Sequence, residues 1–184
     1  GGIFLNGQLY RGYQGAAGEV GHMVIQTGGP LCACGRYGCL EALASGTALA
    51  RQAAELISKK PAANLAKASR QGQTLDGQFL ATMAKQGDSD AIWLWQQLGY
   101  YLGVGIGSLI NIFNPEAVVL SGGLMREAKL FLAAAKKAAS QTVIDARAQK
   151  TPIISGTLGP EAGLIGAAAL AFNGDTPVTG VSPQ

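Results

Sequence analysis

Apolar and small residues recur at helical spacing in two long segments of the chain. The first runs from residue 45 to about residue 60, and the second from about residue 89 to residue 112. In the second segment Gly99, Gly103 and Gly107 are four residues apart, so they lie close to one face of the predicted helix. This spacing favours tight packing of the helix against a neighbour. The intervening residues are more polar and predict shorter helices and turns.

Short apolar runs bounded by turn residues predict strands near both ends of the chain. Two of them flank Asn6-Gly7, a dipeptide that tolerates the positive φ angles of a two-residue hairpin turn. Residues 117–120 are suited to a buried parallel strand, and residues 152–155 form a further strand. A helix is expected at 126–140, between these two strands, and a last helix begins near residue 160. Strands that alternate with helices predict an α/β fold.

Composition and charge narrow the class of protein. The 184 residues are 48% apolar and 14% charged, with 27 glycines, about twice the average share. The net charge of +3 comes from dispersed lysines and arginines, which argues against nucleic-acid binding by this segment. The longest uncharged stretch, residues 91–115, is interrupted by polar residues and glycines, so no membrane span is expected. Three cysteines without an export signal indicate a reducing, cytoplasmic setting.

All the cysteines and the single histidine lie within one short segment. Thiolates and imidazole are preferred zinc ligands, and a structural zinc site uses four of them. The four candidates are His22, Cys32, Cys34 and Cys39. The alternative is that the cysteines are buried, unmodified and act as small apolar side chains. Their clustering favours zinc, bound in a Cys3His knuckle.

Two acidic residues flank this segment. Glu19 precedes His22 by three residues, and Glu41 follows the last cysteine by two. If a metal orders the loop, both carboxylates lie near the imidazole, whose second ring nitrogen remains a hydrogen-bond donor. Such a group suits a polyol with neighbouring hydroxyls. The alternative is that both glutamates cap helices or lie on the surface, and spacing alone does not decide between the two.

Four stretches of the sequence resemble, in order, the successive signatures of the ROK family. They are GAAGEVGHMVI, CACGRYGCLEALASG, INIFNPEAVVLSGGL and LGPEAGLIGAAALA. This family includes bacterial sugar kinases, glucokinases among them, and sugar-responsive repressors. The resemblance extends from residue 1 to about residue 172, and its glutamate, histidine and cysteine pattern is highly specific.

The resemblance implies an actin-like, ribonuclease-H-like ATPase fold, in which two α/β domains close on a cleft. Residues 1–172 would form the larger, carboxyl-terminal lobe, with a sugar- and zinc-binding region at 15–46 and a nucleotide-cleft region at 115–172. Residues 173–184 are expected to be a flexible tail. The long helix and the last helix are expected to leave apolar faces exposed. Proteins of this family often form dimers or tetramers through this lobe, so the resemblance also implies a homo-oligomer.

The resemblance also assigns roles to single residues. His22, Cys32, Cys34 and Cys39 would bind structural zinc. Glu19, His22 and Glu41 would bind the hydroxyls of a hexose, with glucose favoured. Gly122 and Gly123 would line the cleft for ATP, used with Mg²⁺, because glycine allows close approach to the nucleotide.

The sequence departs from the family's kinases at the reacting centre. These kinases have a glycine-rich phosphate loop and an aspartate base in an Asn-Asp pair. No aspartate of this chain follows an asparagine; they are Asp76, Asp88, Asp90, Asp145 and Asp175. No catalytic residue is therefore assigned, the phosphate loop would precede residue 1, and the chain alone is expected to be inactive. The parent protein would transfer the γ-phosphate of MgATP to a hexose; the alternative parent is a sugar-responsive ROK repressor.

Overall fold

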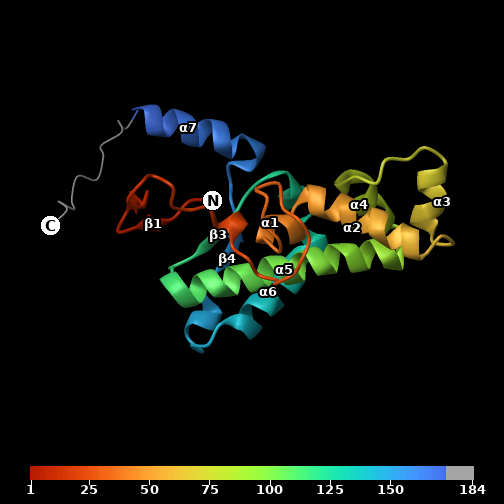
Figure 1. The fold of residues 1–184 in the computed structure, drawn as a ribbon. Helices are drawn as coiled ribbons and strands as arrows, with labels where there is room; N and C mark the ends of the chain where they lie inside the picture. The colour runs from red at the N-terminus through yellow and green to blue at the C-terminus, as the bar shows by residue number, and fades with distance from the viewer. Residues whose placement is uncertain (173–184) are drawn as a thin grey trace.

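Within the described residues, helices form most of the structure, and two small sheets accompany them (Figure 1). The computed structural model describes residues 1–172, so the expected tail at 173–184 lies outside the described residues. One sheet is an antiparallel pair and the other a parallel pair. The expected mixture of strands and helices is confirmed. Within residues 1–172, none of the helices combines the length and apolar character needed to cross a membrane.

The amino-terminal sheet is the hairpin that the sequence predicts. Strand β1 (Phe4–Leu5) pairs with β2 (Gln8–Leu9), and the turn between them is Asn6-Gly7. Asn6 has a φ of 53° and Gly7 a φ of 76°. Positive φ at both central residues matches the right-handed twist of the two strands.

A group of four helices leads to the long central helix. They are α1 (Leu40–Leu43), α2 (Gly46–Lys59), α3 (Asn64–Arg70) and α4 (Gly77–Lys85), followed by α5 (Ser89–Phe113). The Ser45 side chain accepts a hydrogen bond from the Ala48 amide and caps α2, while Asp88 caps α5 in the same way. Leu49, Leu80 and Trp95 are buried where α2, α4 and α5 meet. This core fixes the helices against α5.

The glycine face of α5 is covered by α6 (Ala128–Thr142), which runs beside it (Figure 1). A Cβ on Gly99 would overlap the Phe131 carbonyl oxygen, and one on Gly107 would crowd Thr142. The two backbones therefore lie in direct contact. The tight packing that the glycine spacing predicts is confirmed. The expectation that the long helix also leaves apolar side chains exposed is confirmed away from this face, at Trp93, Tyr100 and Ile112. Trp95 and Phe131 stack nearby, with ring centroids 5.9 Å apart.

The second sheet follows α5. Strand β3 (Val118–Leu120) runs parallel to β4 (Ile153–Ser155), with α6 between them in sequence. Short 3₁₀ helices adjoin these elements at Gly123–Glu127 (η2), Ala148–Lys150 (η3) and Gly159–Glu161 (η4). The prediction of parallel strands is confirmed, but β3 is not buried. Val119 is 59% exposed because this sheet has only two strands within the described residues.

The last helix, α7 (Ala162–Phe172), extends away from the other helices (Figure 1). Its apolar side chains face solvent, with Leu164 75% exposed and Phe172 89% exposed. The expectation of an exposed apolar face is confirmed for this helix.

The contact between α5 and α6 can be tested with Gly103→Ala. The new methyl group would overlap the Ala135 carbonyl oxygen and lie 2.6 Å from the Ala138 Cβ. We expect the free energy of unfolding to fall by about 1–3 kcal/mol, measured by denaturant or thermal unfolding followed by circular dichroism. Gly163→Ala in α7 is the matched control, because an added Cβ there meets nothing within 4 Å. Equal stability of the two variants would contradict the packing account.

Candidate functional site

The segment from His22 to Cys39 folds back on itself. Backbone bridges join Val24 to Cys39 and Leu31 to Tyr37, and the Cys32 amide donates to the Arg36 carbonyl oxygen at 2.8 Å. Gly38 has a φ of 77°, and a Cβ there would overlap the carbonyl oxygen of Gln26. Only glycine fits this crossing, which brings the end of the segment back to its start.

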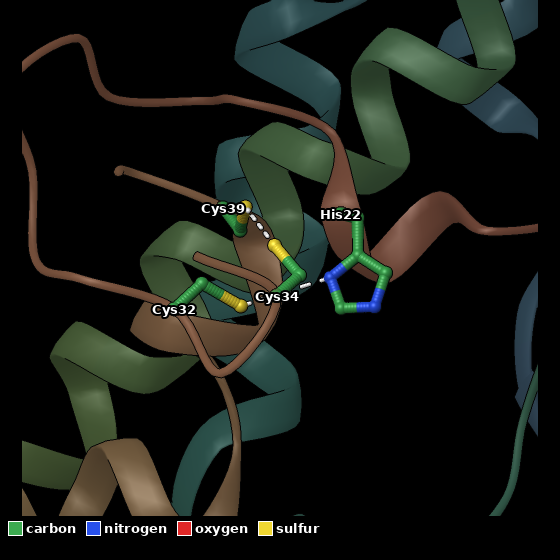
Figure 2. A group of neighbouring side chains, drawn as sticks. All are labelled: His22, Cys32, Cys34 and Cys39. Atoms are coloured by element: carbon green, nitrogen blue, oxygen red, sulfur yellow. Dashed lines mark hydrogen bonds between the residues drawn. The ribbon is translucent and has the colours of Figure 1, made fainter. Parts of the chain in front are cut away.

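This folding brings the four predicted metal ligands together (Figure 2). One donor atom from each of His22, Cys32, Cys34 and Cys39 lies within 4.8 Å of the others. The Cys34 and Cys39 sulfurs are 3.6 Å apart, and the Cys32 sulfur is 3.7 Å from Nδ1 of His22. In a tetrahedral zinc site with bonds of about 2.3 Å, sulfur atoms lie about 3.8 Å apart. The donor set and its spacing therefore fit one tetrahedral ion.

The alternative of three buried, apolar cysteines does not match the burial of these residues. Cys32 and Cys39 are buried, but Cys34 is exposed and its sulfur still points toward Cys39 (Figure 2). An exposed thiol gains nothing by packing. Its position is explained by the common centre that it shares with the other donors.

Both predicted carboxylates lie beside the imidazole. An Oε atom of Glu19 is 3.7 Å from His22 Nε2, and one of Glu41 is 3.5 Å from Nδ1. The side chains of Glu19 and Glu41 are 71% and 49% exposed, so solvent and ligands reach both. Glu19 precedes the 3₁₀ helix Val20–His22 (η1) without capping it through its side chain. The separations from the imidazole exceed an ordinary hydrogen bond. Glu41 Oε2 accepts a hydrogen bond from the Cys32 thiol at 3.7 Å, and the remaining lone pairs of both carboxylates can accept bonds from a ligand.

A glycine outside the predicted stripe positions Glu41. A Cβ on Gly105 of α5 would lie 2.7 Å from a Cδ atom of Leu40, the residue before Glu41. Helix α1 therefore rests on the bare backbone of α5. This contact was not predicted from the sequence, although a fourth glycine in one helix, lying off the common face, indicates that a second neighbour comes close.

The thiols differ in their affinity for protons. Burial, with hydrogen bonding to the neighbouring thiols, raises the pKa of Cys39 from 9.0 to about 11. The hydrogen bond from the Arg36 backbone lowers the pKa of Cys34. Without a metal, the buried Cys39 thiol thus stays protonated, while the exposed Cys34 is the readier thiolate.

Gly122 and Gly123 lie in a different part of the structure. They follow β3, where the Gly156 amide donates to the Leu120 carbonyl oxygen and prolongs the pairing with β4. Gly122 has a φ of 115°, and a Cβ on either glycine would meet nothing within 4 Å. The two glycines are therefore an open turn at the carboxyl ends of parallel strands, the position where α/β sheets bind ligands. They do not line the group around His22.

Residues 1–173 match the ROK family. The chain is 35% identical over 167 residues to a glucokinase of Halalkalibacterium halodurans, covering 90% of this chain and 51% of that protein. It is 30% identical to the xylose repressor of Bacillus subtilis, covering 94% of this chain and 41% of the repressor. The chain spans about half the length of the curated glucokinases that it matches.

The fold is also found in solved structures of the same family. A ROK family glucokinase from Streptomyces griseus, in complex with glucose and AMPPNP, superposes with a TM-score of 0.83 at 33% identity. The match covers 94% of this chain and 57% of that one. The arrangement of helices and strands described above is therefore shared with part of this ROK glucokinase.

The raised pKa of Cys39 predicts how stability depends on pH without a metal. The folded chain keeps this proton up to about pH 11, whereas the unfolded chain releases it near 9.0. Raising the pH through this window therefore favours unfolding and lowers Tm. Cys34 has the opposite effect, because its pKa is lowered in the folded chain and its ionisation stabilises the fold as the pH rises toward 9.0. Above that pH the Cys34 thiol is ionised in both the folded and the unfolded chain, so it adds little further change in stability.

Thermal unfolding of the reduced, chelator-treated chain between pH 9 and pH 11 measures this slope. Cys39→Ser is the matched control, because it removes the titrating group while tyrosines and lysines titrate as before. The wild-type Tm should fall more steeply than that of the variant. Parallel slopes would show that Cys39 does not retain its proton in the folded state.

Proposed function

The chain belongs to the ROK family, and we propose that it is the sugar-binding and nucleotide-facing part of an ATP-dependent hexose kinase similar to glucokinase. The observation that carries the proposal is the group formed by Glu19, His22 and Glu41 beside the clustered thiols. Residues 15–46 supply this group, and residues 115–172 supply the nucleotide side.

The metal of the proposal is zinc, bound by His22 and the three cysteines. Three thiols and an imidazole suit zinc, and four protein ligands leave no open position, so the ion is structural. His22 would coordinate through Nδ1, which faces the sulfurs. Its Nε2 then carries the proton and faces the Glu19 carboxylate. Zinc would order the loop and fix the tautomer of the histidine.

The substrate of the proposal is a neutral hexose, with glucose favoured. Glu19 and Glu41 accept hydrogen bonds from ring hydroxyls, and His22 Nε2 donates one to a hydroxyl oxygen. The charge of the site favours a neutral ligand. Three thiolates outweigh the charge of Zn²⁺, and both carboxylates add further negative charge, so an anionic ligand would be repelled. The Streptomyces griseus relative, solved with glucose and AMPPNP, favours glucose as the hexose.

The nucleotide of the proposal is MgATP, placed at the turn formed by Gly122 and Gly123. Backbone without side chains allows phosphate or adenosine to approach closely. The residue after this turn, Leu124, packs on the start of α2, since a Cβ on Gly46 would lie 3.9 Å from one of its Cδ atoms. Helix α2 follows α1, which carries Glu41 of the proposed sugar site.

Phosphoryl transfer itself needs groups that are not assigned in this chain. It depends on positioning, charge stabilisation and a base that takes the hydroxyl proton. None of the chain's aspartates has the Asn-Asp setting expected of that base. The proposal is therefore that this chain binds sugar and nucleotide but does not transfer phosphate by itself.

A sugar-responsive transcriptional repressor is the second candidate for the parent protein. The similarity to the Bacillus subtilis xylose repressor, over 94% of this chain, supports it. Both candidate proteins need side chains that bind a sugar, but only the kinase needs the open turn at Gly122 and Gly123 to bind a nucleotide. That turn favours the kinase.

The proposed metal predicts one zinc ion per purified chain, measured by elemental analysis, with three thiols released by a chelator. Cys34→Ser should lose zinc and loosen residues 19–41 together, because metal binding orders the loop. Hydrogen exchange of the amides in this segment reports that loosening. The exposed position of Cys34 makes it the substitution least able to disturb packing.

Ser45→Thr is a matched control for the exchange measurement, because it keeps a hydroxyl cap on α2 and touches no ligand. This variant should retain zinc and the exchange pattern of the wild type. Purified wild-type chain with no metal and three freely reactive thiols would contradict the zinc proposal.

With Glu19, His22 and Glu41 as the sugar site, the chain should bind glucose. The Glu41→Gln variant should bind it about tenfold or more weakly. The substitution keeps the size of the side chain but loses a charged acceptor, and hydrogen bonds to charged groups contribute about 1.5–3 kcal/mol. Isothermal titration calorimetry measures the Kd. A coupled assay on the same samples should detect no glucose-dependent release of ADP from ATP.

Glu116→Gln provides the control, since Glu116 is exposed and lies between α5 and β3, outside the site. Its affinity for glucose should equal that of the wild type. Equal affinities of the Glu41 and Glu116 variants would remove Glu41 from the site, and ADP release by the chain alone would show that it contains its own base.

A further inference from the structure

A cavity lies on the face formed by α2 and α5. Its volume is about 620 Å³, within the range of small-molecule binding sites. Gln26 and Pro30 of the cysteine segment line it together with side chains of both helices. None of Glu19, His22 and Glu41 takes part, so the cavity is distinct from the proposed hexose site.

One wall of the cavity is a stripe of three side chains along α5. Trp93, Gln97 and Tyr101 are spaced four residues apart and all line the cavity. At 1.5 Å per residue, the two aromatic side chains are separated by about 12 Å along the helix axis. Trp93 is 48% exposed, so a large part of its ring is available to a ligand. The stripe thus offers two apolar surfaces with an amide between them.

The neutral polar groups of this stripe are free to bind a ligand. Within residues 1–172, the Gln97 amide, the Tyr101 hydroxyl and the Trp93 indole N–H have no hydrogen-bond partner. On the opposite wall, Gln52 donates from Nε2 to the Leu43 carbonyl oxygen, which leaves its own amide oxygen available. Donors and acceptors therefore face the cavity from both helices.

Most of the charged groups around the cavity are already paired. Lys60 contacts Asp90 at 2.6 Å, and Arg51 forms an ion pair with Glu55. Lys59 adds one exposed ammonium group at the end of α2. Because each carboxylate is matched by a cation, a charged ligand would have to displace an existing pair. A neutral ligand requires no such exchange.

From these features we infer that the cavity between α2 and α5 binds a neutral saccharide of at least two rings. The apolar faces of the sugar rings would lie against Trp93 and Tyr101, and ring hydroxyls would bond to Gln97 and Gln52. The length of the stripe favours a disaccharide over a single ring. This inference does not rest on the proposed kinase function, because the two sites share no ligand-binding side chain.

Titration of the chain with maltose, cellobiose and lactose tests the inference, with binding followed by calorimetry and by tryptophan fluorescence. At least one disaccharide should bind saturably and change the emission of Trp93. Gln97→Ala should weaken binding about fivefold, as expected for a lost hydrogen bond. Trp93→Ala should weaken it about tenfold or more through the lost ring contact. Gln96→Ala is the matched control, because Gln96 is exposed on the same helix but does not line the cavity.

Glu41→Gln separates this site from the hexose site. Disaccharide binding that persists in this variant and is weakened in Gln97→Ala but not in Gln96→Ala supports the inference. Three results would overturn it: no saturable binding of any of the three disaccharides, binding lost in Glu41→Gln, or equal binding by the Gln96 and Gln97 variants. Sedimentation showing a dimer that Trp93→Ala dissociates would also overturn it, because the face would then be covered by a second copy.

Discussion

The structure depends on close approach to the backbone of α5 from two sides. Gly99, Gly103 and Gly107 admit α6 on one side, and Gly105 admits Leu40 of α1 on another. Any side chain at these positions would separate the helices, since the nearest atoms are backbone oxygens or buried carbons. The first contact builds the core, and the second positions the start of α1, where Cys39 and Glu41 are found.

Sequence periodicity predicted α2, α5 and α6 well because each buries an apolar face within the same chain. The last helix was also predicted, although the apolar side chains of α7 are exposed. The hairpin at Asn6-Gly7 was equally predictable, since its φ angles are a local property of the two residues. The burial of β3 could not be predicted in this way. An apolar strand is buried only if neighbouring elements cover it, and the apolar run at residues 118–120 carries no information about how many strands lie beside it.

The site was predictable where its chemistry is concentrated in the sequence. Cysteines and a histidine within 18 residues restrict the geometry strongly, and the structure gathers all four donors. Glu19 and Glu41 were found by their nearness in sequence to these ligands. Gly105 and the stripe at Trp93, Gln97 and Tyr101 were not, because a helix sequence does not show which neighbour approaches each of its faces.

The cysteine segment is closed by its own backbone bridges, and Leu40, which follows it, packs on the α5 backbone at Gly105. The charge of the proposed sugar site bears on how a nucleotide would approach it. In the proposed site, three thiolates and two carboxylates would outweigh the charge of the zinc ion, which favours hydroxyl donors over an uncompensated phosphate. The open turn at Gly122 and Gly123 is the uncharged backbone proposed to lie against the nucleotide. Under the proposed function, the chain would therefore retain sugar recognition, while the reaction would depend on groups that bring the two ligands together.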